Sequence, residues 1–386
     1  MSTESPQFSL VAGEASGDLL AGLLLDGMHQ RWPQMQASGI GGARMAERGF
    51  KAWWPSDKLS VFGYIDALRH YREILGIRNQ LKSKLLANPP DIFIGVDAPD
   101  FNLDLEADLR QAGIKTVHFV CPSIWAWRPK RVEKLKKSCD HVLCVFPFEP
   151  EILAKHGIPA TFVGHPLASV IPMQPDKAKA RELLGLHLED KVVAVLPGSR
   201  LAELKHLAPR YFKAVAGVFI AFPAMKFIVP SMPKHIPLLQ QIAKDCGVEN
   251  QVQIISGQSH TALEACDVTL ITSGPATLEA ALYKRPMVIG YALNWLSYEI
   301  MKRKKLQPWV GLPNILSGKF VVPELIQDAA TPEALAAATL AWFDAPEKVA
   351  DLERQFTFLH TQLLRNTSEL AADAIAQVLN KTSKAS

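Results

Sequence analysis

Two carboxylates follow a short apolar run in the first half of the chain. Asp97 and Asp100 come directly after residues 91–96, a run typical of a strand buried in a parallel sheet. The residue after such a strand lies at the sheet edge where α/β proteins bind ligands. A carboxylate there can act as a general base if burial or a neighbouring charge tunes its pKa. We predict that Asp97 is catalytic, and that Asp100 caps the following helix.

A second group of residues suits a phosphate. Residues 268–271 read as a buried strand, and a helix is expected from Pro275, with Ser273 or Thr272 capping its first turn. The free amides and the dipole at that helix start attract an anion, although the dipole alone contributes only about 0.3–1 kcal/mol. Glu279, one turn later, is placed to accept hydrogen bonds from ribose hydroxyls. An ordinary capped helix explains these residues equally well.

A matching loop follows residues 191–196, another expected strand. Gly198 in this loop allows close approach of the backbone, and the Arg200 guanidinium offers a fixed fork of donors to a phosphate. Further on, Asn314 lies within residues 311–316, a segment that is too apolar for an exposed loop. Its spacing leaves open whether Asn314 binds a ligand or orders a turn.

The loop formed by residues 13–18 follows the first expected strand and precedes an apolar helix from Leu19. Only Gly13 and Gly17 are present, so this is not a GxGxxG fingerprint, and the chain has no GxxxxGK loop. Both absences count against a nicotinamide enzyme and an ATPase. Glu14 is costly beside a buried strand end unless it meets a polar group, which favours a functional role over a helix cap.

Strand-like and helix-like segments alternate almost throughout, which predicts an α/β protein with parallel sheets and crossover helices. The first sheet is expected to contain residues 8–12, 91–96, 116–120, 141–146 and 160–163, and the second residues 191–196, 225–229, 252–255, 268–271 and 287–289. Residues 165–177, with three prolines, read as a linker, and the segment from Pro332 to about Asn380 as helices. Two doubly wound domains facing across a cleft would place the polar loops there.

The composition is that of an ordinary globular protein. A length of 386 residues favours two domains, with 48% hydrophobic and 21% charged residues. The net charge of +4 is too small to argue for nucleic acid. Five cysteines without a CxxC motif fit a reduced cytosolic protein without structural zinc. The sequence shows no signal peptide and no membrane-spanning run, which places the protein in the cytoplasm or on a membrane surface.

One helical stripe within residues 59–77 has two explanations. Its apolar members are Ile65, Leu68, Tyr71 and Leu75, and the basic residues among or after them are Arg69, Arg72, Arg78, Lys82 and Lys84. A helix packed on the core usually explains such a stripe. A surface helix lying on anionic lipid has the same pattern, with basic residues at its rim. The sequence leaves this choice open.

Several motifs taken together, in order, resemble the bacterial lipid-A-disaccharide synthases, which form glycosyltransferase family 19. They are Val11-Ala-Gly-Glu-Ala-Ser-Gly-Asp18, Asp97-Ala-Pro-Asp-Phe-Asn102, Pro122-Ser-Ile-Trp-Ala-Trp-Arg128, Val163-Gly-His-Pro166, Leu196-Pro-Gly-Ser-Arg200, Ser273-Gly-Pro-Ala-Thr-Leu-Glu-Ala-Ala281 and Leu312-Pro-Asn-Ile-Leu316. Each motif is weak alone, but the ordered set is specific and covers nearly the whole chain.

The resemblance implies a GT-B fold with an acceptor-binding domain at residues 1–170 and a UDP-sugar-binding domain at 171–355. Helices of residues 356–386 are expected to pack back on the first domain. The implied reaction joins UDP-2,3-diacylglucosamine to 2,3-diacylglucosamine 1-phosphate (lipid X), with inversion and without a cofactor or metal. It gives UDP and a β-1,6-linked disaccharide. Family resemblance also implies a homodimer held peripherally at the inner membrane.

The resemblance assigns roles to individual residues. Asp97 is the base for the acceptor 6-hydroxyl, and Glu279 is the ribose-binding carboxylate. The residues expected around the rest of UDP are Gly198, Ser199, Arg200, Ser273, Gly274, Ala276 and Thr277, and those lining the substrate cleft are Gly13, Glu14, Ser16, Arg128 and Asn314. Ile65, Leu68, Tyr71 and Leu75 would meet the membrane. Many relatives carry threonine or another small residue where this chain has Pro275, so any phosphate contact there falls to the amides of Gly274, Ala276 or Thr277.

Two other functions fit the same fold. A UDP-sugar 2-epimerase would use several carboxylates and histidines and no acyl chains. A membrane-surface binding protein would keep the fold without catalysis.

Overall fold

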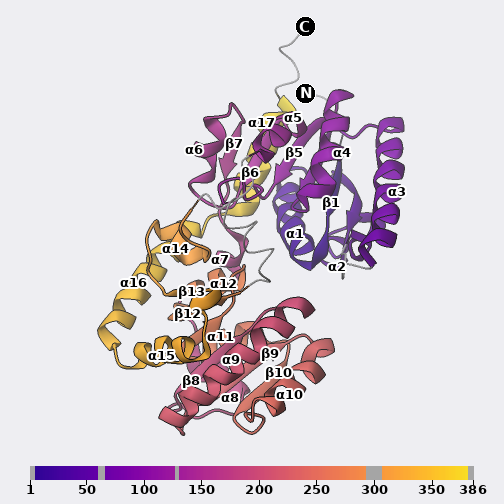
Figure 1. The fold of residues 1–386 in the computed structure, drawn as a ribbon. Coiled ribbons are helices and arrows are strands. Elements are labelled where there is room, and N and C mark those ends of the chain that lie inside the picture. The colour runs from indigo at the N-terminus through magenta and orange to yellow at the C-terminus, as the bar shows by residue number, and fades with distance from the viewer. Residues whose placement is uncertain (1–4, 60–65, 127–129, 293–306, 381–386) are drawn as a thin grey trace. The chain divides into compact units, whose positions relative to one another are not determined.

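The computed structural model describes residues 5–59, 66–126, 130–292 and 307–380, and the chain forms two compact units (Figure 1). Unit 1 consists of Met1–Pro166 and Gln362–Ser386, and unit 2 of Leu167–Thr361. The chain therefore passes from one unit to the other twice. The domain boundaries after residues 170 and 355 remain predictions from the sequence.

In the described part of unit 1, seven parallel strands form one sheet in the order β3-β2-β1-β4-β5-β6-β7. Its elements are β1 (Gln7–Ala12), α1 (Glu14–Arg31), β2 (Gln36–Gly41), α2 (Ala43–Ala46), β3 (Lys51–Pro55), a 3-10 turn (Ser56–Leu59), α3 (Asp66–Ala87), β4 (Ile92–Val96), α4 (Pro99–Gln111), β5 (Lys115–Phe119), α5 (Arg131–Ser138), β6 (His141–Cys144), α6 (Glu149–Ala154), β7 (Ala160–Phe162) and α17 (Thr367–Asn380).

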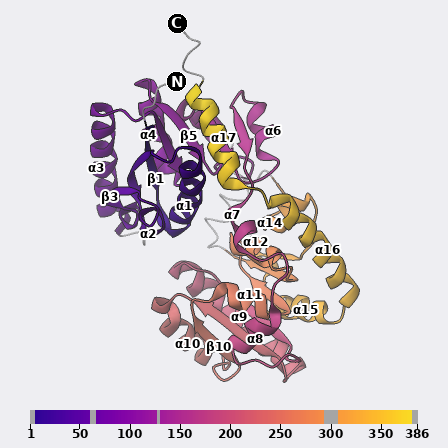
Figure 2. The same cartoon turned by 180° about the vertical axis from the view of Figure 1, so that it is seen from behind.

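Helices cover the sheet of unit 1. The whole of β4 is buried, and Phe93 packs with Leu81 of α3 and Leu105 of α4 in one apolar cluster. The buried residues of α3 (Ile77, Leu81 and Leu85) recur every four residues, which places them on one helix face. The helix α17 packs against α1, and Figure 2 shows it running across unit 1. This core holds the strand ends of unit 1 in fixed places.

Unit 2 repeats the design, with six described parallel strands in the order β10-β9-β8-β11-β12-β13. Its elements are α7 (Pro166–Val170), α8 (Lys177–Leu183), β8 (Val192–Leu196), α9 (Leu201–Ala221), β9 (Lys226–Ser231), a 3-10 turn (Pro233–His235), α10 (Ile236–Asp245), β10 (Val252–Ser256), α11 (Ser259–Ala265), β11 (Val268–Ile271), α12 (Ala276–Leu282), β12 (Met287–Tyr291), α14 (Leu312–Ser317), β13 (Glu324–Ile326), a 3-10 turn (Gln327–Ala329), α15 (Pro332–Phe343) and α16 (Pro346–Leu363). The buried Tyr211 of α9 locks this helix to the sheet, because its hydroxyl donates to the Gly290 carbonyl at 2.7 Å.

Each sheet has one point where the strand order reverses. In unit 1 this switch point lies between β1 and β4, and in unit 2 between β8 and β11. Ligands of doubly wound sheets bind at the carboxyl ends of the strands at such points. The segments with Gly13, Asp97, Arg200 and Ser273 follow these four strands, whereas Asn314 lies on α14. The predicted fold, two doubly wound Rossmann-like domains of the GT-B type with C-terminal helices, is confirmed.

Three local predictions were wrong. The helix expected from Leu19 begins at Glu14, so Glu14 and Ser16 lie in the first turn of α1 and not in a loop. An acidic residue there complements the helix dipole. The edge strands β3 and β13 were not predicted, because both are short and lack a fully buried run. The expected linker contains the helix α7, which begins at Pro166.

Candidate active site

The loop after β4 is strained at the predicted base. Asp97 and Ala98 both have left-handed backbone conformations, with φ of 51° and 42°. For residues other than glycine this conformation costs roughly 1–2 kcal/mol each, so the surrounding structure must enforce it. The Asp97 side chain is half-buried. Strain of this kind is typical of functional sites.

Hydrogen bonds to β5 and α4 hold this turn in place. The Asp97 N–H donates to the Phe119 carbonyl at 2.8 Å, and the Asn102 N–H donates to the Ala98 carbonyl at 3.0 Å. The Asn102 side chain donates to the Asp97 carbonyl at 2.8 Å. The prediction that Asp100 caps α4 was wrong. The N-cap residue is Ala98, without a side-chain bond, and the exposed Asp100 carboxylate pairs with Arg131.

The loop after β1 lies directly against this turn. A Cβ atom added to Gly13 would be 3.4 Å from the Ala98 Cβ, within van der Waals contact, which shows how near the two loops lie. Asp18 has a structural role, since its carboxylate accepts from the amides of Gly42 (2.8 Å) and Arg44 (2.9 Å) at the start of α2. The side chains of Glu14 and Ser16, and the whole of Arg128, lie outside the described residues.

In unit 2, the loop after β8 is occupied by a carboxylate of the chain itself. Glu203 accepts from the Ser199 and Arg200 amides at 3.2 and 3.3 Å, and from the Arg200 guanidinium at 3.3 Å. Gly198 has φ of 137°, and a Cβ added there would be 2.7 Å from the Glu203 Cβ. The Arg200 side chain is 84% exposed. This loop therefore offers the exposed guanidinium to an anion more readily than its amides, which already donate to Glu203 at the third position of α9.

The loop after β11 differs from the sequence prediction. Neither Ser273 nor Thr272 caps α12, because the Ser273 hydroxyl donates to the Val310 carbonyl at 2.9 Å. Sequence could not reveal this partner 37 residues away. The Thr277 amide and hydroxyl both donate to the Gly274 carbonyl, at 3.1 and 2.7 Å. Of the three amides considered for a phosphate, those of Gly274 and Ala276 remain.

Asn314 orders the segment around it. The buried side-chain oxygen accepts from the amides of Val321 (2.8 Å) and Val322 (3.0 Å). Its nitrogen donates to the Val322 carbonyl and to Glu324, at 2.9 and 2.8 Å. Glu324 in turn accepts from the Val310 amide at 2.9 Å. Of the two alternatives left open by the sequence, the described contacts are those of a structural residue that supports the loop bonded to Ser273.

Glu279 has a neighbour that the sequence did not indicate. The His260 Nε2 atom lies 3.5 Å from a carboxylate oxygen of Glu279, and its ring meets the Tyr283 ring edge-on. The hydrogen bond to Glu279 raises the pKa of His260, and burial opposes this effect. No spacing in the sequence links these residues, because α11 and α12 become neighbours only when the strands assemble into the sheet.

The stripe on α3 is only partly described. Ile65 and the side chains of Leu68 and Tyr71 lie outside the described residues, and Leu75 is half-buried. Three of the basic groups are engaged within unit 1. Arg78 and Lys82 pair with Asp104 and Asp108 of α4 at 2.9 and 2.8 Å, and Lys84 lies 4.7 Å from the centre of the Trp53 ring. The Lys84 side chain is nevertheless exposed and that of Lys82 is 37% exposed, so a helix lying on lipid stays a prediction.

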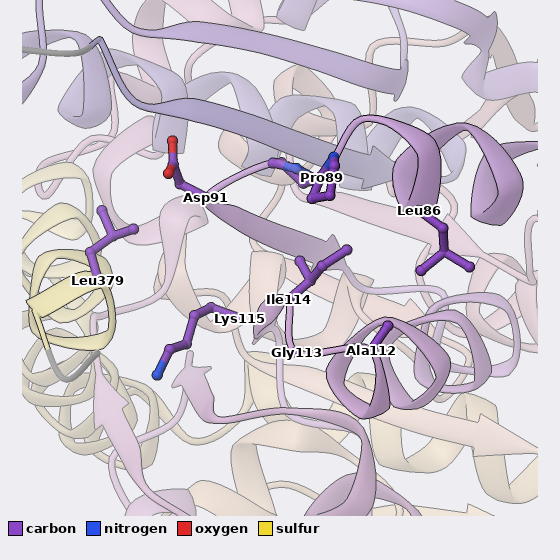
Figure 3. Close-up of a pocket in the computed structure, with 9 residues that line it drawn as sticks. Leu86, Pro89, Asp91, Ala112, Gly113, Ile114, Lys115 and Leu379 are labelled. Atoms are coloured by element: carbon purple, nitrogen blue, oxygen red, sulfur yellow. The ribbon is translucent and has the colours of Figure 1, made fainter. Parts of the chain in front are cut away.

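The other features of unit 1 lie away from the switch point. A cavity of about 420 Å³ lies at the amino ends of β4 and β5, with Asp91, Lys115 and Leu379 among its lining residues (Figure 3). It contains none of the predicted site residues.

Among the described residues, no group of three or more His, Cys, Asp or Glu side chains could hold a metal ion. No helix within the described ranges is long and apolar enough to cross a membrane.

Comparisons with known proteins cover the whole chain. The family described as Lipid-A-disaccharide synthetase matches residues 8–377. A lipid-A-disaccharide synthase from Albidiferax ferrireducens is 64% identical over 97% of both chains. Among solved structures, a putative UDP-N-acetylglucosamine 2-epimerase from Listeria monocytogenes has a TM-score of 0.67 at 12% identity, covering 100% of this chain and 98% of its own. A UDP-GlcNAc 2-epimerase from Neisseria meningitidis bound to UDP-GlcNAc has a TM-score of 0.63 at 11% identity, covering 97% and 100%. At these identities the two epimerases share the fold alone.

Proposed function

The chain belongs to the lipid-A-disaccharide synthase family, and we propose that it joins UDP-2,3-diacylglucosamine to lipid X with inversion and release of UDP. As a member of this family it is a glycosyltransferase of lipid A biosynthesis. The product would be the β-1,6-linked disaccharide 1-phosphate. An epimerase is not favoured, since the likeness to epimerases extends only to the fold.

Asp97 is the proposed base. The observation that carries this assignment is the enforced left-handed turn at the switch point of unit 1, which fixes a half-buried carboxylate just past a buried strand. Inversion requires the acceptor hydroxyl to attack the anomeric carbon as UDP leaves from the opposite face. Asp97 would take the proton from the 6-hydroxyl during this attack. Proton transfer to a positioned group typically accelerates a reaction by about 10²–10⁴-fold.

Unit 2 would stabilise the departing UDP. Negative charge grows on the diphosphate as the glycosidic bond breaks, and fixed donors lower the energy of that state. The exposed Arg200 guanidinium and the amides of Gly274 and Ala276 are the proposed donors, and Glu279 would accept from the ribose hydroxyls. Gly198, Ser199, Ser273 and Thr277 would shape the two loops through the contacts described above.

The acyl chains of both substrates suggest where the enzyme works. We infer that it acts at the cytoplasmic surface of the inner membrane, where Ile65, Leu68, Tyr71 and Leu75 would meet lipid. The homodimer remains a proposal from the family resemblance.

An acceptor-dependence assay tests the proposed reaction. Purified enzyme is incubated with UDP-2,3-diacylglucosamine, and UDP is measured with and without lipid X. We expect UDP and the disaccharide to form in equal amounts, and only when lipid X is present. Release of UDP without acceptor, or isomerisation of the donor sugar, would exclude the transferase.

A further inference from the structure

The side chain of Asn102 is completely buried behind the strained turn. Besides the 2.8 Å bond to the Asp97 carbonyl, its Nδ2 atom makes two longer bonds of 3.4 Å, to the carbonyls of Val11 and Val96. These carbonyls belong to β1 and β4, the two strands that flank the switch point of unit 1. One amide group thus joins both strand ends to the residue that follows them.

The three carbonyls around Nδ2 fix the orientation of this amide. The opposite orientation would place the Oδ1 atom against three acceptors. In the observed orientation, Oδ1 is buried without a hydrogen-bond partner among the described residues. A buried polar atom without a partner is unfavourable, so its presence in a helix that could carry an apolar residue calls for an explanation. Holding the Asp97 carbonyl supplies one.

Asn102 packs directly against the backbone of β4. A Cβ atom added to Gly95 of β4 would be 2.9 Å from the Asn102 Cβ and 2.1 Å from a Glu106 oxygen, so both side chains rest directly on the strand. Glu106 is itself fixed by the buried His118, whose Nδ1 atom lies 2.7 Å from its carboxylate. Asn102 is therefore a rigid support and not a flexible surface amide.

Resting on the proposed role of Asp97, we propose that Asn102 is a positioning residue, which aims the Asp97 carboxylate by holding its peptide group in the left-handed turn. If the Asp97 carbonyl is released, the strained turn relaxes and the direction of the Asp97 Cα–Cβ bond changes. Misplacement of a catalytic group by about 1 Å can cost on the order of 10²-fold in rate.

The variant Asn102→Asp keeps the shape of the side chain and replaces its two N–H donors by a carboxyl group that has at most one O–H donor. Its matched control is Thr116→Val, which removes a buried 2.8 Å bond to the Ser138 carbonyl elsewhere in unit 1. We measure kcat, both KM values, UDP affinity and the thermal midpoint. We expect kcat of Asn102→Asp to fall on the order of 10–100-fold, with KM and UDP affinity within about threefold of wild type. Thr116→Val should keep its kcat even if its midpoint falls as far.

Several outcomes overturn the proposal: unchanged kcat in Asn102→Asp, a loss equal to the unfolded fraction, or the same loss in Thr116→Val. If Asn102→Asp does not fold, Asn102→Ser is judged by the same measurements. The variant Asp97→Glu gives a second test, because its longer side chain already moves the carboxylate away from the position that Asn102 is proposed to set. If Asn102 acts through Asp97, its replacement in that background adds little, whereas multiplying losses contradict the proposal. If Asp97→Asn is itself active, the proposed base is wrong. If Asp97→Asn is inactive while the Asn102 variants keep full kcat, only the positioning role fails.

Discussion

The switch points of the two units have the same topology and opposite local design. In unit 1 the chain is strained at Asp97 and is held by the buried amide of Asn102. In unit 2, backbone amides of the loops donate to carboxylates of the chain itself. Glu203 accepts from the loop after β8, and Glu324 accepts from the Val310 amide beside the Ser273 contact. The first arrangement fixes a single side chain in one direction. The second leaves the Arg200 guanidinium exposed and supports the loop whose Gly274 and Ala276 amides are proposed to bind UDP.

This contrast shows how one fold serves two halves of a reaction. A general base must lie within hydrogen-bond distance of one particular hydroxyl. Its placement therefore has to be accurate, and backbone strain is tolerated where it provides that placement. A diphosphate is larger and is bound by several donors, so hydrogen-bonded loops without strain are sufficient. The following predictions test whether the first switch point governs turnover and the second governs UDP.

The largest expected effect follows removal of the proposed base. Asp97→Asn should lower turnover by about 10²–10⁴-fold, because the amide cannot accept the acceptor proton. UDP affinity, measured by calorimetry, should be unchanged, since unit 2 supplies the proposed UDP contacts. Near-normal turnover would show that Asp97 is not the base. Loss of UDP binding together with turnover would show that unit 1 does not act separately from the UDP contacts.

A smaller effect is expected at Arg200. Arg200→Ala should weaken UDP binding by roughly 10–100-fold, because a hydrogen bond to a charged group contributes about 1.5–3 kcal/mol. Glu203→Gln is the matched control. It removes a negative charge beside the guanidinium and keeps the side-chain length, so UDP affinity should be equal to or higher than that of wild type. A comparable loss in Glu203→Gln would show that the cap geometry, and not the Arg200 charge, determines binding.

Asn314→Ala should act mainly on stability. The change leaves the part-buried amide of Val321 and the buried amide of Val322 without their acceptor, which costs about 1–3 kcal/mol in the free energy of unfolding. The control Gln240→Ala, at an exposed residue of α10, should cost less than about 0.5 kcal/mol. Chemical denaturation measures both. If Asn314→Ala is stable but cannot bind UDP, Asn314 contacts the ligand directly and unit 2 contains a fixed polar group like that of unit 1.

The sequence predicted the frame of both switch points. The predicted strand at 268–271 is exact, and that at 91–96 is one residue longer than β4, because continuous apolar runs mark buried parallel strands. Short edge strands such as β13 lack this signal.

The contacts that define each site were less predictable. The Ser273 hydroxyl was expected to cap α12, yet its partner comes from a distant loop. Asn102 is the last residue of the motif that begins at Asp97, but nothing in its spacing showed that its amide would reach the ends of β1 and β4. Local pattern determines the elements, whereas side-chain partners depend on how the strands are ordered in the sheet.

The smallest expected effect concerns His260 and Glu279 in unit 2. Because the contact with Glu279 raises the pKa of His260 above its ordinary value of 6.5, the folded chain binds this proton more tightly than the unfolded chain. The stabilisation is therefore complete below about pH 6.5 and is lost as the pH rises through the raised pKa. The His260 side chain is 39% exposed, so the pair should contribute only about 0.2–1 kcal/mol.

Urea unfolding of wild type and His260→Gln at about pH 5.5 and about pH 8.5 tests this sign. The variant should be less stable than wild type at the lower pH and nearly equal to it at the higher pH. A difference that stays constant with pH would mean that His260 supports Glu279 by packing against Tyr283 alone. In that case His260 would not give Glu279 a charged partner, and the contrast between the switch points would rest on the strained turn held by Asn102 and on the loops bonded to Glu203 and Glu324.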